Sequence, residues 1–110
     1  MIPLQTQAQF ETLLRPEDEN GKPAPETVII YFTAEWCKAC KKLDLDALQS
    51  SIKDSIWYKC DVDENTYTLG YCGLSKLPSF GFIKGGKFVG KVSSNNTDVV
   101  LEAIRQTFSG

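Results

Sequence analysis

The chain has 110 residues, of which 42% are hydrophobic, and a formal net charge of -2. This length and apolar content suit a single domain over residues 1–110 with one core. The lysines are scattered, whereas nucleic acids and anionic membranes bind a basic face, so we expect proteins or small molecules as partners, with no nucleic acid and no membrane.

The N-terminal segment, residues 1–10, has no basic leader, no long apolar stretch and no small-residue cleavage site. No window of the chain reaches the apolar length of a membrane span. We therefore expect a soluble, cytoplasmic protein that acts as a monomer. In a reducing compartment, its four cysteines are expected to be catalytic or metal-binding rather than structural disulfides.

The first half of the chain predicts a strand, a helix and a long connection. A short strand near residues 2–4 precedes a helix that starts after Thr6, because Thr6 and Gln9 have the spacing of a capping box. Residues 15–26 concentrate proline, glycine and charge, which is typical of a solvated loop. The uninterrupted apolar run 27–33 predicts a central strand that is covered on both faces.

A β-α-β unit follows, with two cysteines where its helix begins. The apolar spacing predicts one helix from Cys37 through Leu48, and residues 56–62 have strand character. After a polar segment with room for one brief helix, residues 77–92 read as two strands joined by Gly85 and Gly86, a hairpin signal.

The chain closes with an asparagine-capped helix over residues 95–108, whose apolar side chains form one face. The order of elements is strand, helix, strand, helix, strand, short helix, hairpin and final helix. This order predicts an α/β fold in which a mixed sheet of about five strands is flanked by four helices, with helices on both faces.

The segment AEWCKACKK contains the strongest chemical signal of the chain. A thiol attacks only as the thiolate, and a cysteine in a first helical turn meets free N–H groups and the positive end of the helix dipole. Lys38 and two neighbouring lysines add positive charge. Cys37 is therefore the expected nucleophile and Cys40, one turn inside, the resolving thiol.

Other interpretations of the cysteines remain open at this stage. Cys37 and Cys40 could be purely structural, or they could bind zinc together with Cys60 and Cys72, although the latter two do not form a second close pair and the chain has no histidine. Cys60 reads as a small core residue. Cys72 is expected to be an inert surface or loop thiol unless a family resemblance gives it a role.

Four features together resemble the thioredoxin family: VIIYFTAEWCKACKKL with Trp36 before the first cysteine, KCDVDEN, LPSFGFIKGGKFVGKV with its Pro78, and the terminal helix. The resemblance covers essentially the whole chain. It implies the thioredoxin fold and thiol-disulfide exchange that requires no bound cofactor. It also implies that Pro78 is a cis-proline beside the cysteines and that Leu77 offers its backbone to an extended substrate. The position of Cys72 resembles that of the extra regulatory cysteine of some animal thioredoxins. Trp36, directly before Cys37, is expected to form an apolar floor beside the sulfur, with a core aromatic as the alternative.

The chain departs from the family pattern in three places. Lys38 and Ala39 stand between the cysteines, where the family usually has Gly-Pro, which changes charge and rigidity. Tyr31 stands where the family usually buries an aspartate that assists the resolving cysteine, so Lys59, which normally neighbours that aspartate, lacks its partner. Ser94 replaces a glycine of the substrate-facing surface.

We therefore expect a protein-disulfide reductase. Its expected partners are disulfide-containing proteins and an electron donor such as thioredoxin reductase or a glutathione system. Two alternatives stay open: a more oxidising disulfide oxidase or isomerase, and a thioredoxin-fold adaptor whose redox activity is incidental, which the departures at Tyr31 and Ser94 favour.

Overall fold

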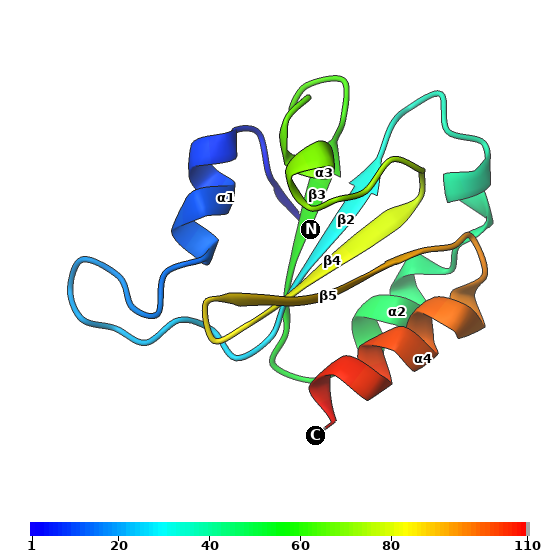
Figure 1. The fold of residues 1–110 in the computed structure, drawn as a ribbon. Helices are drawn as coiled ribbons and strands as arrows, with labels where there is room; N and C mark the ends of the chain where they lie inside the picture. Colours follow the sequence, from blue (N-terminus) through cyan, green and yellow to red (C-terminus); the bar gives the residue numbers. More distant parts are fainter. Residues whose placement is uncertain (110) are drawn as a thin grey trace.

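A computed structural model describes residues 1–109 and shows a five-stranded mixed sheet in the order β1-β3-β2-β4-β5 (Figure 1). β1, β2 and β3 are mutually parallel, whereas β4 runs antiparallel to β2 and β5 antiparallel to β4. The strands are β1 (Ile2–Pro3), β2 (Val28–Thr33), β3 (Ile56–Asp61), β4 (Ser79–Lys84) and β5 (Lys87–Ser93). The predicted mixed sheet is confirmed.

Helices cover both faces of this sheet, as the order of elements predicted. The helices are α1 (Gln7–Leu13), the 3-10 helix η1 (Ala39–Lys42), α2 (Leu45–Ser50), α3 (Thr68–Tyr71) and α4 (Thr97–Phe108). Leu48 of α2 and Ile104 of α4 join one hydrophobic cluster, whereas Phe10 of α1 joins a second cluster. Figure 1 shows α1 on one side of the sheet and α2 and α4 on the other.

β2 forms the centre of the fold. All six of its residues are buried, and the side chains of residues 28–32 alternate between the two hydrophobic clusters. This explains why its sequence is apolar without polar alternation, since both faces of the strand are covered. The loops that follow β2 and β3, and the loop that enters β4, therefore meet at one end of the sheet (Figure 1).

Local sequence signals fix several element boundaries. Thr6 and Gln9 form the predicted capping box at α1, and the Asn96 side chain accepts the Val99 N–H at the start of α4. At the β4-β5 hairpin, Gly85 and Gly86 have φ values of 57° and 82°, which favour glycine.

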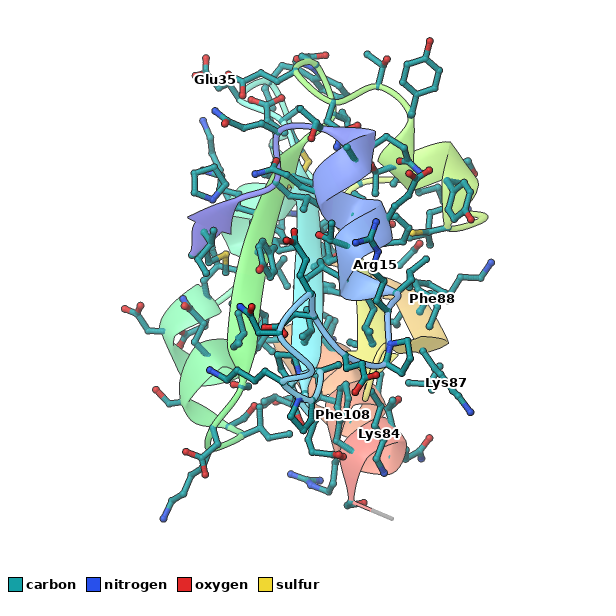
Figure 2. All side chains as sticks on the ribbon, turned by 90° about the vertical axis from the view of Figure 1, so that its left-hand side faces the viewer. Arg15, Glu35, Lys84, Lys87, Phe88 and Phe108 are labelled. Atoms are coloured by element: carbon teal, nitrogen blue, oxygen red, sulfur yellow. A yellow bond between two sulfur atoms is a disulfide. The ribbon has the colours of Figure 1, made fainter. Side chains whose placement is uncertain are left out.

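The loop after α1 packs against this hairpin. A Cβ atom on Gly86 would collide with the carbonyl of Arg15, so only glycine fits there. Figure 2 shows Arg15 on the same side of the molecule as Lys87 and Phe88 of β5. The solvated connection that the sequence predicts is therefore anchored at its beginning.

The predicted continuous helix from Cys37 to Leu48 is wrong. Leu43 has an extended backbone, with φ -78° and ψ 141°, and it separates η1 from α2. The Asp44 side chain accepts the Ala47 N–H at 3.0 Å and so begins α2 anew, while the Asp44 N–H donates to Thr97 Oγ at the start of α4. Two side-chain hydrogen bonds thus satisfy the backbone at the break.

None of the helices within residues 1–109 is both long and apolar enough to cross a lipid bilayer.

Candidate active site

Cys37 and Cys40 lie just beyond the end of β2 and are joined by a disulfide bond, with their Cα atoms 5.4 Å apart. The chain turns after β2, where the Cys37 N–H donates to the Ala34 carbonyl at 3.1 Å, and Cys40 then sits in η1. Each of the two residues is 5% exposed. The pair is therefore close enough for reversible oxidation and nearly covered by the protein.

A backbone donor distinguishes the two sulfur atoms. The Cys40 N–H donates a hydrogen bond to Cys37 Sγ at 3.2 Å. Hydrogen bonding to the charged form of a group favours that form, so this donor stabilises negative charge on Cys37 Sγ when the disulfide is reduced. The exposed side chains of Lys38, Lys41 and Lys42 add positive charge to the same segment.

On one side of the cysteine pair lies a hollow of about 210 Å³, here called the Pro78 hollow. The Leu77-Pro78 peptide bond is cis. Within residues 1–109, neither the N–H nor the carbonyl of Leu77 makes a hydrogen bond. The residues that line the Pro78 hollow are Ala39, Lys76, Leu77, Pro78, Ser93, Ser94 and Asn95.

The hydroxyl groups of buried Ser79 and exposed Ser93 hold the loop that forms this hollow. Ser79 Oγ donates to the Lys76 carbonyl and lies 2.7 Å from Ser93 Oγ on β5. Ser79 is fully buried. The loop from Lys76 to Pro78 is thereby tied to the sheet, which leaves the Leu77 backbone displayed at a fixed position.

A second hollow, of about 380 Å³ and here called the Tyr31 hollow, is lined by both cysteines. Its lining includes Tyr31 and Lys59, which are directly opposite each other on β2 and β3. Tyr31 is 3% exposed and stacks on Phe80, with ring centroids 5.2 Å apart. Glu35 supplies the single carboxylate of this lining.

Trp36 is a surface residue held by a side-chain hydrogen bond. It is 65% exposed, and its indole N–H donates to an Asp63 carboxylate oxygen at 2.8 Å. The alternative of a core aromatic is therefore wrong, whereas the apolar floor beside the sulfur stays a prediction. Asp63 lies in the KCDVDEN segment, but the sequence alone does not reveal that its carboxylate holds Trp36 in place.

Cys60 and Cys72 lie in the hydrophobic cluster on the opposite face of the sheet from Cys37 and Cys40. Burial, together with the neighbouring Cys72 and Asp61, raises the pKa of the Cys60 thiol to about 12. Burial also raises the pKa of Cys72 to about 11, although Lys91 acts to lower it. Both are weak nucleophiles at neutral pH.

This arrangement answers two expectations about the cysteines. Cys72 lies in the turn after α3 but is only 6% exposed, so it is a buried loop thiol and the surface position is wrong. The four cysteines cannot share one zinc ion, since the sheet separates the two pairs. No group of three or more histidine, cysteine, aspartate or glutamate residues that could hold a metal ion occurs in the described part of the chain.

Taken together, the mixed five-stranded sheet and a Cys-x-x-Cys pair after its central strand define a thiol-disulfide oxidoreductase with the thioredoxin fold. The thioredoxin family model matches residues 3–106, and the chain belongs to the thioredoxin family. It is thus a protein-disulfide reductase whose redox-active pair is Cys37 and Cys40.

Curated relatives and solved structures agree with this assignment. A thioredoxin of Geodia cydonium is 36% identical over 86 residues, 76% of each chain. Thioredoxin H4 of Arabidopsis thaliana is 30% identical over 93 residues, covering 81% of this chain and 78% of the relative. The Fasciola hepatica thioredoxin structure has a TM-score of 0.79 at 28% identity, covering 97% of this chain and 99% of that one.

The structure of oxidised mitochondrial thioredoxin 3 from Saccharomyces cerevisiae is similar as well. It has a TM-score of 0.80 at 26% identity, covering 96% of this chain and 94% of that one. The likeness therefore extends over the whole fold, including the elements that position the cysteines and Pro78.

Proposed function

We propose that Cys37 is the attacking thiol and Cys40 the resolving thiol in the reduction of protein disulfides. The Cys37 thiolate forms a bond to one substrate sulfur and expels the other as a thiolate. The Cys40 thiolate then attacks Cys37 Sγ and releases the second substrate sulfur. The substrate gains two electrons, the two product thiolates take protons from water, and the protein ends as the Cys37-Cys40 disulfide.

The observation that carries this assignment is the hydrogen bond from the Cys40 N–H to Cys37 Sγ. The two residues are equally buried, so exposure does not separate their roles. The backbone donor favours the thiolate at Cys37, and the thiolate is the nucleophile. The 5.4 Å separation of the Cα atoms allows the internal disulfide that completes the cycle.

The free backbone of Leu77 supports recognition of an extended substrate segment. Its N–H and carbonyl are available for the main-chain hydrogen bonds of strand addition. Main-chain hydrogen bonds do not depend on the substrate's side chains, so we propose that the protein accepts a range of protein substrates. The segment would lie over the Pro78 hollow, next to Cys37.

We also propose that the protein works in the cytoplasm and is recycled by thioredoxin reductase or a glutathione system. Buried thiols at Cys60 and Cys72 suit a reducing compartment. Ser94 lines the Pro78 hollow and alters the surface that a reductase would meet. The test is to measure the rate at which thioredoxin reductase and the glutathione system each reduce the Cys37-Cys40 disulfide. The system with the higher rate is the one that recycles the protein.

An adaptor with incidental redox activity is the second candidate, because Tyr31 and Ser94 line the two hollows beside the cysteines. Reduction of insulin disulfides by dithiothreitol separates the candidates. We expect the protein to accelerate the reaction, Cys37→Ser to abolish the acceleration and Cys72→Ala to preserve it. A rate no greater than with dithiothreitol alone would favour the adaptor.

A further inference from the structure

We infer that lysines beside the Pro78 hollow select substrates whose disulfide is flanked by acidic residues. This inference rests on the proposed reduction of protein disulfides, and it names the class of substrate that the site prefers. Its basis is a local excess of positive charge that contrasts with the net charge of -2 for the whole chain.

The two lysines beside the Pro78 hollow are Lys76 and Lys38. Lys76 lines the hollow and directly precedes Leu77, whose backbone is free for an extended substrate. Lys38 is exposed and directly precedes Ala39, which lines the hollow from the cysteine side. Both ammonium groups therefore belong to the segments that border the substrate segment, one on each side of it.

Neither charge is neutralised by a neighbouring carboxylate. Within residues 1–109, the one salt bridge is that between Arg105 and Glu102, far along the chain on α4. The lining of the Pro78 hollow contains no aspartate or glutamate. The acidic residues nearest to Lys38 along the chain are Glu35, which lines the Tyr31 hollow, and Asp44, whose carboxylate caps α2. The acidic residue nearest to Lys76 along the chain is Glu64, twelve positions away.

The geometry of strand addition places substrate side chains next to these lysines. Successive side chains of an extended segment point in opposite directions. Alternate residues before and after the substrate cysteine therefore point towards the same edge of the Pro78 hollow, where the lysines lie. An acidic residue there meets an uncompensated lysine, whereas a basic residue meets a like charge. The contrast between acidic and basic flanks is therefore larger than the contrast between acidic and neutral flanks.

The expected size of the preference follows from the exposure of the lysines. An exposed charge pair changes affinity by up to about fivefold, and salt screens it over about 10 Å. With two lysines involved, we expect kcat/KM to differ by about tenfold between acidic and basic peptides at low salt. High salt should reduce the difference to less than about twofold.

The test uses three peptides that share one disulfide-closed ring and differ only in flanking glutamate, glutamine or lysine residues. Their reduction is measured with the reduced protein and with the variants Lys38→Glu, Lys76→Glu and the double variant. Lys53→Glu is the matched control, since it makes the same charge change just before β3, at the end of the sheet away from the cysteines. The readout is the ratio of kcat/KM values, in which any change in Cys37 nucleophilicity cancels.

We expect the glutamate peptide to react fastest, the double variant to prefer the lysine peptide, and Lys53→Glu to keep the original ratio. Equal rates for the three peptides, or the same shift in Lys53→Glu as in Lys76→Glu, would overturn the inference. The neutral disulfide 2,2′-dithiodipyridine separates this failure from failure of the proposed function. If the protein reduces 2,2′-dithiodipyridine and reduces all three peptides at equal rates, only the inference fails. If it reduces neither 2,2′-dithiodipyridine nor any peptide, both the inference and the proposed function are overturned.

Discussion

Tyr31 stacks on Phe80 with ring centroids 5.2 Å apart, and Tyr31 also lines the hollow that reaches Cys40. The resolving cysteine must lose its proton before it attacks, and a nearby carboxylate would accept that proton. Here the buried side chain in this position is a phenol instead of a carboxylate. The resolving step therefore depends on water or on a carboxylate at the mouth of the hollow.

Replacing Tyr31 with aspartate should accelerate the resolving step near neutral pH. The variant should also lose about 3 kcal/mol of stability, because it removes a buried ring and buries a carboxylate. Stopped-flow release of the substrate thiol from a mixed disulfide on Cys37 measures the rate. Tyr31→Phe is the matched control and should keep the original rate, whereas an unchanged or slower rate in folded Tyr31→Asp would contradict this account.

Alkaline pH should destabilise the oxidised protein through its two buried thiols. The folded-state pKa values of Cys60 and Cys72, about 12 and about 11, lie above the ordinary value of 9.0. The unfolded chain therefore releases these protons first, so stability is complete below pH 9 and falls as the pH rises towards the folded-state values.

The loss should be less than about 1.4 kcal/mol per pH unit for each thiol. Urea unfolding at a series of pH values from neutral to alkaline measures it, and Cys60→Ala should show a shallower decline than the parent. Identical slopes for the parent and for both Cys60→Ala and Cys72→Ala would show that these thiols do not titrate differently in the folded and unfolded protein.

Removing the Ser79 hydroxyl should weaken substrate binding. Ser79→Ala leaves the Lys76 carbonyl and the Ser93 hydroxyl without their partner, at a cost of about 1 to 3 kcal/mol in stability. The loop that presents Leu77 then loses its attachment, so KM for insulin should rise more than kcat falls. Ser93→Ala retains the bond to Lys76 and should have the smaller effect; equal KM values for the two variants would argue against the anchoring role.

The tether between Trp36 and Asp63 should matter for activity more than for stability. Asp63→Ala frees an indole that is already exposed, so unfolding free energy should change by less than about 1 kcal/mol. We expect kcat/KM for insulin to fall several-fold, with Asp63→Asn restoring most of it because its amide oxygen still accepts the indole N–H. A loss of activity in Asp63→Asn as large as in Asp63→Ala would assign the effect to charge instead.

Much of this fold is predictable from local patterns. The apolar run of β2, the Gly85-Gly86 turn and the Asn96 cap each act within a few residues, and the structure retains all three. The break after η1 was not predicted, because the apolar spacing continues through Leu43. The signal that could have revealed it is Asp44, an N-cap residue four positions before Leu48.

Long-range contacts set the features that sequence patterns did not predict. The exposed position of Trp36 depends on Asp63, which is 27 residues away, and the burial of Cys72 depends on its packing in the cluster beneath α1. The Asp44 N–H likewise depends on Thr97, which is 53 residues away. None of these partners leaves a periodic signal, so the cysteine pair could be located from the sequence but the surroundings that hold it could not.

The most direct test of the central claim is to trap the mixed disulfide with single-cysteine variants. Cys40→Ser should accumulate disulfide-linked complexes with substrate proteins from a cell extract, because a serine hydroxyl cannot displace a sulfur at neutral pH. Cys37→Ser should form few such complexes, since Cys37 Sγ is the sulfur that accepts the backbone N–H. Non-reducing gels that show strong trapping by Cys40→Ser and weak trapping by Cys37→Ser would support the assigned roles. Equal trapping by the two variants, or trapping that requires Cys60 or Cys72, would contradict them.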